Sequence, residues 1–375
     1  MPNIIFDVFT IQCVKIVYLP LSFQSYPVNS QSNYFHVRLP QNLFLGKKAK
    51  IFINYCVGPI LFIWLSISIY RHILSQPNWQ QTWSRIKTEI YGDEAWKVIL
   101  VIALMFVNWS LEALKWKVLV QHIEKVSFAR AFKAILAGVS LAMNTPNRVG
   151  EYFGRIIYIN EGNRMRAIPL TLVGSISQLI ITVLFGCFGL LFLSDALEHM
   201  PQLNVGLSLI WINATIYLSL GAVTILILFY YRLRSAIKLL EKIPFVAKYV
   251  YFIEKLEEFR WKELTRVLVL SLCRYATFIL QYVLLMQVFD VNIGIWQGCW
   301  LTMVMFLALA VVPTIALAEL GLRGHLSMHL FGLFSNNTLG IVFTATGIWL
   351  INLVVPALAG SLFILGVKLF RSKTA

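Results

Sequence analysis

Two short polar clusters interrupt the apolar parts of this sequence, and both contain arginine. In the first, Arg148, Glu151 and Arg155 recur at spacings of three and four residues, which would place them on one face of a helix. Two guanidinium groups beside one carboxylate leave a positive charge that suits an anion. Arginine can bind two phosphate oxygens at once, so we predict a phosphate-binding cluster. A basic loop that only sets membrane orientation is the alternative.

The second cluster lies near the C-terminal end of the chain. Glu319 and Arg323 are four residues apart, in the order that favours an ion pair on a helix. His325 and His329 share this spacing, but no third ligand is adjacent, so we predict no metal site and no cofactor. Arg274 stands alone in an apolar stretch and needs a partner or a water-filled cavity there.

Prolines and glycines accompany both clusters and predict interruptions of the helices. Pro146 and Pro313 should each end the preceding helix, because the residue before a proline is pushed out of the helical conformation. Gly150 and Gly154 have the four-residue spacing that allows two helices to approach closely. Gly321 lies within the second cluster. We assign these five residues a structural role.

The composition shows that these charged residues belong to a membrane protein. Of the 375 residues, 58% are hydrophobic and only 13% are charged, whereas soluble domains carry about 25% charged residues. Lys and Arg number 32 and Asp and Glu number 17, which gives a net charge of +15. Cytoplasmic loops of membrane proteins account for such an excess, and no nucleic-acid motif accompanies it. An ordinary soluble enzyme is therefore excluded.

Stretches of about 20 apolar residues are long enough to cross a bilayer. We predict spans at 51–70, 97–114, 168–193, 207–230, 264–288, 296–317 and 338–366. Two further apolar segments, 131–143 and 319–334, are shorter and interrupted.

The distribution of Lys and Arg predicts that both termini face the cytoplasm. Segments 131–160 and 296–334 can then each enter and leave the membrane on one side, the first from inside and the second from outside. We therefore predict an all-α polytopic integral membrane protein with about six full spans and two oppositely directed re-entrant hairpins. Eight to nine spans with proline kinks is the alternative. Broken helices of this kind mark the midplane site of transporters.

The chain divides into three parts by composition. Residues 1–46 form an N-terminal extension that we expect to be poorly ordered. Residues 47–371 form the membrane domain, and residues 372–375 form a tail. Within the membrane domain, segment 231–263 mixes apolar residues with Lys and Glu, which predicts an amphipathic cytoplasmic loop. The expected location is the inner (plasma) membrane.

The two clusters together resemble those of the flippase-like membrane domain of lysylphosphatidylglycerol synthases, a domain that also occurs alone. That family has a Pro-Gly-x-x-Gly-Glu-x-x-Arg-like stretch, which residues 146–155 resemble, and a Pro…Gly-x-Gly-x-Arg-Glu-like stretch, which residues 313–324 resemble. The resemblance covers roughly residues 50–366. In the second stretch Gly324 replaces the usual acidic residue, and Glu319 replaces a usual glycine.

The resemblance implies a protein that moves an anionic phospholipid or a polyprenyl-phosphate-linked lipid between leaflets. Arg148 and Arg155 would receive the phosphate from the cytoplasmic side. Arg323 with Glu319 would form a second site reached from outside, and Arg274 would line the path.

The sequence also bears on enzymatic activity and leaves two alternative functions. The aminoacyl-transfer domain of the family's synthases does not follow, so we expect no lysyl transfer and no enzymatic activity. One alternative is a membrane subunit or accessory of a lipid-modifying transferase, with a separate cytosolic transferase as its partner. The other is a solute permease. The sequence leaves a homo-oligomer open.

Overall fold

The structure is a computed structural model, and it describes the membrane domain in several continuous ranges. These are 95–143, 148–199, 206–233, 254–312 and 319–365, with isolated positions at 67, 71, 84, 92, 145, 235 and 237. The contacts divide the chain into Met1–Gly46 and Lys47–Ala375, and every described residue belongs to the second unit. Several predicted features lie outside the described residues: the extension 1–46, all but one residue of the span 51–70, most of segment 231–263, the tail 372–375, Pro146 and Pro313.

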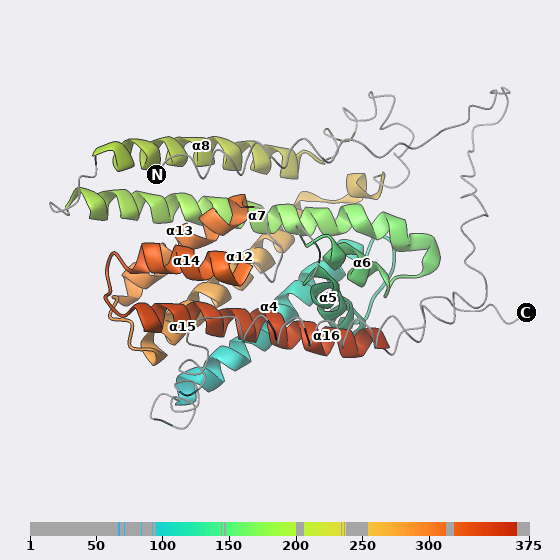
Figure 1. Ribbon diagram of the computed structural model, residues 1–375. Coiled ribbons are helices and arrows are strands. Elements are labelled where there is room, and N and C mark those ends of the chain that lie inside the picture. The colour runs from blue at the N-terminus through green and yellow to red at the C-terminus, as the bar shows by residue number, and fades with distance from the viewer. Residues whose placement is uncertain are drawn as a thin grey trace, which may run out of the picture. The chain divides into compact units, whose positions relative to one another are not determined.

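All regular elements of the described ranges are helices (Figure 1). Five helical stretches are long and apolar enough to cross a membrane. They are α4 (Ala95–Val120), α7 (Arg164–Glu198), α8 (Gly206–Tyr231), α12 (Trp261–Val288) and the continuous pair α15 (Thr338–Trp349) and α16 (Val355–Leu365). The prediction of an all-α polytopic membrane protein is confirmed.

Four shorter helices form two helical hairpins. The first consists of α5 (Phe128–Ala142) and α6 (Gly150–Ile156), and the second of α13 (Ile295–Val311) and α14 (Glu319–Phe331). At about 1.5 Å per residue, α5 is about 22 Å long and α13 about 26 Å. Both are shorter than the hydrocarbon core of about 30 Å. The predicted span 296–317 is therefore a shorter helix that ends at Val311.

Each hairpin is closed at its base by an asparagine. The backbone N–H of Asn160, after α6, donates to Glu124 Oε2, before α5, at 2.9 Å. In the second hairpin, Asn337 Nδ2, after α14, donates to the carbonyl of Phe289, before α13, at 3.0 Å. The first and last residues of each hairpin thus lie side by side, and its tip lies at the opposite end.

The two hairpins lie toward opposite ends of the α15–α16 rod (Figure 1). The first packs through α5 against α16, and the second packs through α14 against α15. A π-helical turn, Leu350–Val354, joins α15 to α16. The hairpin tips therefore approach each other near this turn.

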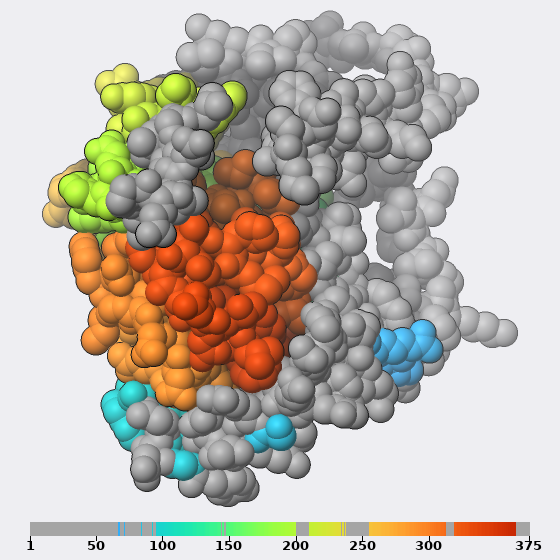
Figure 2. Space-filling view, turned by 60° about the vertical axis from the view of Figure 1, so that its left-hand side comes forward, coloured from blue at the N-terminus to red at the C-terminus, as the bar shows by residue number. Residues whose placement is uncertain are grey.

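Spans α4, α7 and α12 pack against one another and are joined by buried polar contacts. Gln281 Nε2 of α12 donates to the Val101 carbonyl of α4 at 2.9 Å, and the hydroxyls of Ser177 and Ser271 lie 2.8 Å apart between α7 and α12. The space-filling view shows the orange and red C-terminal segments as one continuous packed face (Figure 2).

Glycines set the distance between the first hairpin and its neighbours. A Cβ atom at Gly154 of α6 would lie 2.4 Å from the Gly138 Cα atom of α5. A Cβ atom at Gly360 of α16 would lie 1.9 Å from the Leu136 carbonyl oxygen. Helix α5 is therefore in backbone contact on both sides, and any larger side chain would force these helices apart.

We predict that Gly154→Ala destabilises the protein, because the new methyl group meets backbone atoms that cannot move aside. The expected cost is about 1–3 kcal/mol, the range for overpacked interiors. Unfolding by SDS in mixed micelles, followed by tryptophan fluorescence, would measure it. Gly221→Ala in α8 is the matched control, because no atom lies within 4 Å of its Cβ position. The control should be neutral or stabilising. Equal stability of the two variants would contradict the close approach.

Candidate functional site

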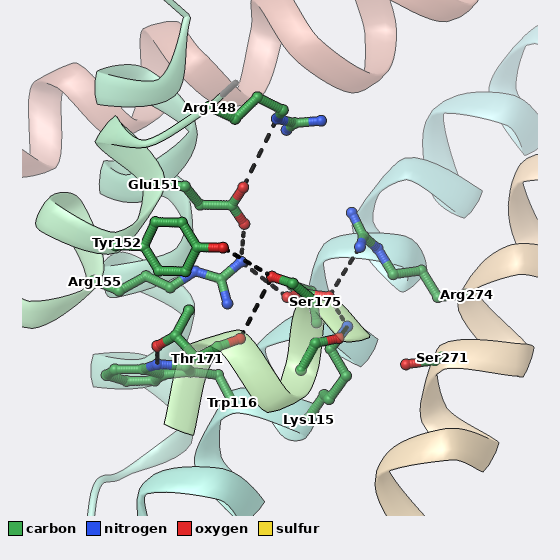
Figure 3. Close-up of polar contacts among 12 residues, drawn as sticks. Lys115, Trp116, Arg148, Glu151, Tyr152, Arg155, Thr171, Ser175, Ser271 and Arg274 are labelled. Carbon is green, nitrogen blue, oxygen red and sulfur yellow. Dashed lines mark hydrogen bonds and ion pairs between the residues drawn. The ribbon is translucent and has the colours of Figure 1, made fainter. Parts of the chain in front are cut away.

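A single carboxylate, that of Glu112 in α4, contacts three cations. Its Oε2 atom lies 2.7 Å from Lys115 Nζ and 2.9 Å from Arg274 Nη1. Its Oε1 atom lies 2.9 Å from Arg155 Nη2. At most 3% of the side chains of Glu112, Lys115 and Arg155 is exposed. The cations belong to α4, α12 and α6, so this carboxylate joins two spans to the first hairpin. Figure 3 shows Lys115, Arg155 and Arg274 of these elements pointing toward one another.

Arg155 has a second carboxylate partner, Glu151, one turn earlier in α6. Its guanidinium group thus lies between Glu112 and Glu151 and is buried. The sequence placed this residue in a phosphate site, whereas the structure directs its charge toward the protein's own carboxylates.

Arg148 lies in the turn that precedes α6. Helix α6 begins at Gly150, and Arg148 has a left-handed backbone with φ of 57°. The prediction that Arg148 shares a helical face with Glu151 and Arg155 is therefore wrong, although its Nε atom still lies 3.7 Å from Glu151 Oε2. The Thr145 hydroxyl stabilises the turn by accepting the Gly150 N–H at 2.8 Å. Left-handed backbone costs a non-glycine residue about 1–2 kcal/mol.

A cavity of about 50 Å³ lies where the two hairpin tips meet. Arg148 reaches it from the first hairpin, Glu319 and Arg323 reach it from the second, and Arg274 reaches it from α12. Its other lining residues are Trp109, Phe278, Ile348, Trp349, Asn352 and Leu353. The two predicted sites thus meet at one cavity, which has room for one or two water molecules at about 30 Å³ each.

Two of the cavity arginines are held in place by neighbours. Arg323 pairs with Glu319, as the spacing predicted, and its Nη1 donates to the Tyr282 hydroxyl at 2.7 Å. Arg274 donates from Nε to Asn108 Oδ1 at 2.9 Å, and its guanidinium carbon lies 5.2 Å from the centre of the Trp109 ring. Both guanidinium groups are therefore oriented before any ligand arrives.

The cavity lies near the middle of three spans. Asn108 is the fourteenth of the 26 residues of α4, and Arg274 is the fourteenth of the 28 residues of α12. Asn352 is the fifteenth of the 27 residues of Thr338–Ile364, within the π-helical turn. Asn108 Nδ2 donates to Asn352 Oδ1 at 3.4 Å, which joins two of these midpoints. Charges at this depth are costly unless they are partnered.

The buried cluster carries an excess of positive charge. Around Glu112 and Glu151 lie four cations, namely Lys115, Arg148, Arg155 and Arg274. Four cations against two carboxylates leave two positive charges, and the Glu319–Arg323 pair adds none.

Several residues of the cavity lining also have hydrogen-bond donors without an acceptor. Among the described residues, four that line the cavity have a buried N–H group without a hydrogen-bond partner: Trp109 Nε1, Arg148 Nε, Arg323 Nε and Asn352 Nδ2. All four are donors, and a buried donor without an acceptor costs about 1–3 kcal/mol. The cavity thus combines positive charge with unused donors, as an anion site requires.

Glu112 lies within the predicted span 97–114, but it was not among the predicted site residues. Glu112 pairs with Lys115 one turn further along α4, and Asn108 bonds to Asn352 between two helices. Their place at the site was missed. A carboxylate inside an apolar stretch is itself a functional signal, which could have identified Glu112.

The described residues contain no group of three His, Cys, Asp or Glu side chains arranged to hold a metal ion. The His325 and His329 rings lie 4.2 Å apart on α14, and His329 Nδ1 is 3.0 Å from the His325 carbonyl oxygen.

We predict that Glu112→Gln destabilises the protein by about 3–5 kcal/mol, because three buried cations lose their shared carboxylate. Unfolding by SDS in mixed micelles would measure the loss. Glu258→Gln is the matched control, since Glu258 pairs with Lys255 at a side chain that is 43% exposed. The control should cost less than about 1 kcal/mol. Similar losses for the two variants would show that Glu112 does not join the helices.

Comparison with known proteins identifies a family for this chain. No curated protein and no solved structure matches the chain. The family model for the lysylphosphatidylglycerol synthase TM region matches residues 51–360, a range that contains every residue of the cavity. Because this match covers most of the chain, the protein belongs to the lysylphosphatidylglycerol synthase transmembrane-region family, as its two arginine clusters suggested.

Proposed function

We propose that the central cavity binds the phosphate of an anionic phospholipid or polyprenyl-phosphate lipid, and that the hairpin tips pass this headgroup between leaflets. The unused donors at the cavity carry the proposal. Four residues that line this space of about 50 Å³ have a buried N–H group without a partner, and the adjoining ion cluster has two surplus positive charges. A phosphate diester offers acceptor oxygens and a negative charge, and it has no donor of its own.

The choice of arginine supports phosphate over other anions. Arg148, Arg274 and Arg323 converge on the cavity from three separate elements. Guanidinium groups bind phosphate oxygens through parallel N–H groups. The apolar remainder of the lining, which includes Phe278 and Leu353, suits the glycerol and acyl portions of a lipid. The family name also refers to a phosphatidylglycerol derivative.

The cavity is too small for a lipid headgroup, so the proposal requires the hairpin tips to move apart. A headgroup is larger than one or two water molecules, so the tips must separate to admit it. Arg148 is suited to this step, because its side chain is 38% exposed and its contact with Glu151 is long, at 3.7 Å. It would exchange Glu151 for the phosphate. In the bilayer, we propose that the α5–α6 hairpin is re-entrant from the cytoplasm, the side indicated by its basic flanks, and α13–α14 from the opposite side.

A translocation assay tests this function. The protein is placed in phosphatidylcholine liposomes that contain phosphatidylglycerol with a fluorescent label on its acyl chain. With wild-type protein, dithionite added outside should reduce the label of both leaflets, because lipids of the inner leaflet move outward. We predict that Arg148→Gly/Arg323→Gln slows loss of the protected half at least tenfold. Arg232→Gln, which removes an exposed arginine beyond α8, should match wild type.

Arg148→Gly alone separates function from folding. Glycine adopts the left-handed turn without the cost that arginine bears, so the free energy of unfolding should fall by less than about 1 kcal/mol. Its translocation rate should nevertheless fall. Translocation at the wild-type rate by both cavity variants would contradict the proposal. Binding of phosphatidylglycerol without translocation by wild type would favour the alternative role as a membrane subunit of a lipid-modifying transferase.

A further inference from the structure

A second and larger pocket, of about 800 Å³, lies outside the central site. It is formed by the last turns of α4, the residues that lead into α5 and the first turns of α12. None of its lining residues lines the central cavity. On α12, Arg266 of this pocket and Arg274 of the central cavity are eight residues apart, which is about 12 Å along the helix.

Three exposed cations surround this pocket, namely Lys117, Lys125 and Arg266. None of them forms an ion pair with another residue in the described ranges of the chain. The one carboxylate of the lining, Glu263, is already bound: it accepts from Gln121 Nε2 at 2.8 Å and from the Arg260 N–H at 3.0 Å. Three cations against one carboxylate leave two surplus positive charges in the lining, and no ion pair among the described residues compensates them.

The same pocket also contains apolar residues. Leu114, Val118 and Val126 belong to its lining. Two large apolar side chains are exposed near the ends of the same helices, Phe128 at the start of α5 and Trp261 at the start of α12. Aromatic side chains exposed at the end of a span are typical of the interface between lipid and water. The pocket lining thus combines basic and apolar residues, and the aromatic residues near it are of the kind that lie at a membrane surface.

We propose that this pocket is a second lipid site, which binds the phosphate headgroup of an anionic phospholipid at the membrane surface. Lys117, Lys125 and Arg266 would contact the phosphate, and Leu114 and Val118 would contact the start of the acyl chains. Basic pockets between spans are a known type of headgroup site. The inference does not depend on the function proposed for the central cavity, because the two sites share no residue. A soluble phosphate compound has the same charged part, but it would leave the apolar lining residues without a partner.

Binding in detergent solution tests this site. Dihexanoyl-phosphatidylglycerol is the lipid probe, and glycerol 3-phosphate and inorganic phosphate are the soluble probes. The variant Lys117→Gln/Lys125→Gln/Arg266→Gln should bind the lipid probe at least tenfold more weakly than wild type at one of its sites. The matched control is Lys133→Gln/Arg232→Gln/Lys262→Gln, which removes equal charge outside the pocket. It should bind as wild type does.

The central variant Arg148→Gly/Arg323→Gln separates the two sites, because it should retain the binding that the pocket variant loses. Lipid binding at least tenfold tighter than binding of either soluble probe supports a headgroup site. Equal affinity for the lipid and glycerol 3-phosphate would overturn the lipid assignment in favour of a soluble phosphate compound. Unchanged binding by the pocket variant, or an equal loss in the control, would overturn the site itself.

Discussion

The buried carboxylate of Glu112 is the constraint on which the rest of the site depends. A carboxylate in an apolar interior is costly unless cations and donors surround it. Here it contacts Lys115 on its own helix, Arg274 on α12 and Arg155 on α6. The first hairpin can dock between the spans because Arg155 completes this set. The glycine contacts of α5 and α6 then bring the backbone close enough for the ion pairs to form.

This arrangement divides the arginines into two groups. Arg155 lies between Glu112 and Glu151, so its charge is neutralised by these carboxylates and stabilises the docked hairpin. Arg148 and Arg323 lie at the tips of opposite hairpins and face one cavity. The protein's own carboxylates do not neutralise all of these cations, which distinguishes the cavity from an ordinary buried ion pair. The surplus charge and the unpaired donors occur at the same place, near the middle of three spans.

The sequence predicted local features of this structure well and long-range ones poorly. Apolar length predicted the spans, and the i, i+4 spacing predicted the Glu319–Arg323 pair, because both depend on neighbours in the chain. The contact between Glu112 and Arg274 joins residues 162 positions apart, and helix packing alone determines it. Arg148 lies in a left-handed turn that the Thr145 hydroxyl stabilises. The prediction from helical spacing that Arg148 lies on the face of Glu151 and Arg155 therefore failed. The spacing of residues within each cluster could not predict that both clusters line one cavity.

The most direct test of the central claim is to identify the lipids that stay with the protein. Wild type and Arg148→Gly/Arg323→Gln would be extracted into native nanodiscs, and the retained lipids would be measured by mass spectrometry. The account predicts that wild type enriches an anionic phospholipid or a polyprenyl phosphate, and that the variant loses part of this enrichment. The same lipid composition around both proteins would contradict a phosphate site at the cavity and would leave its arginines a structural role.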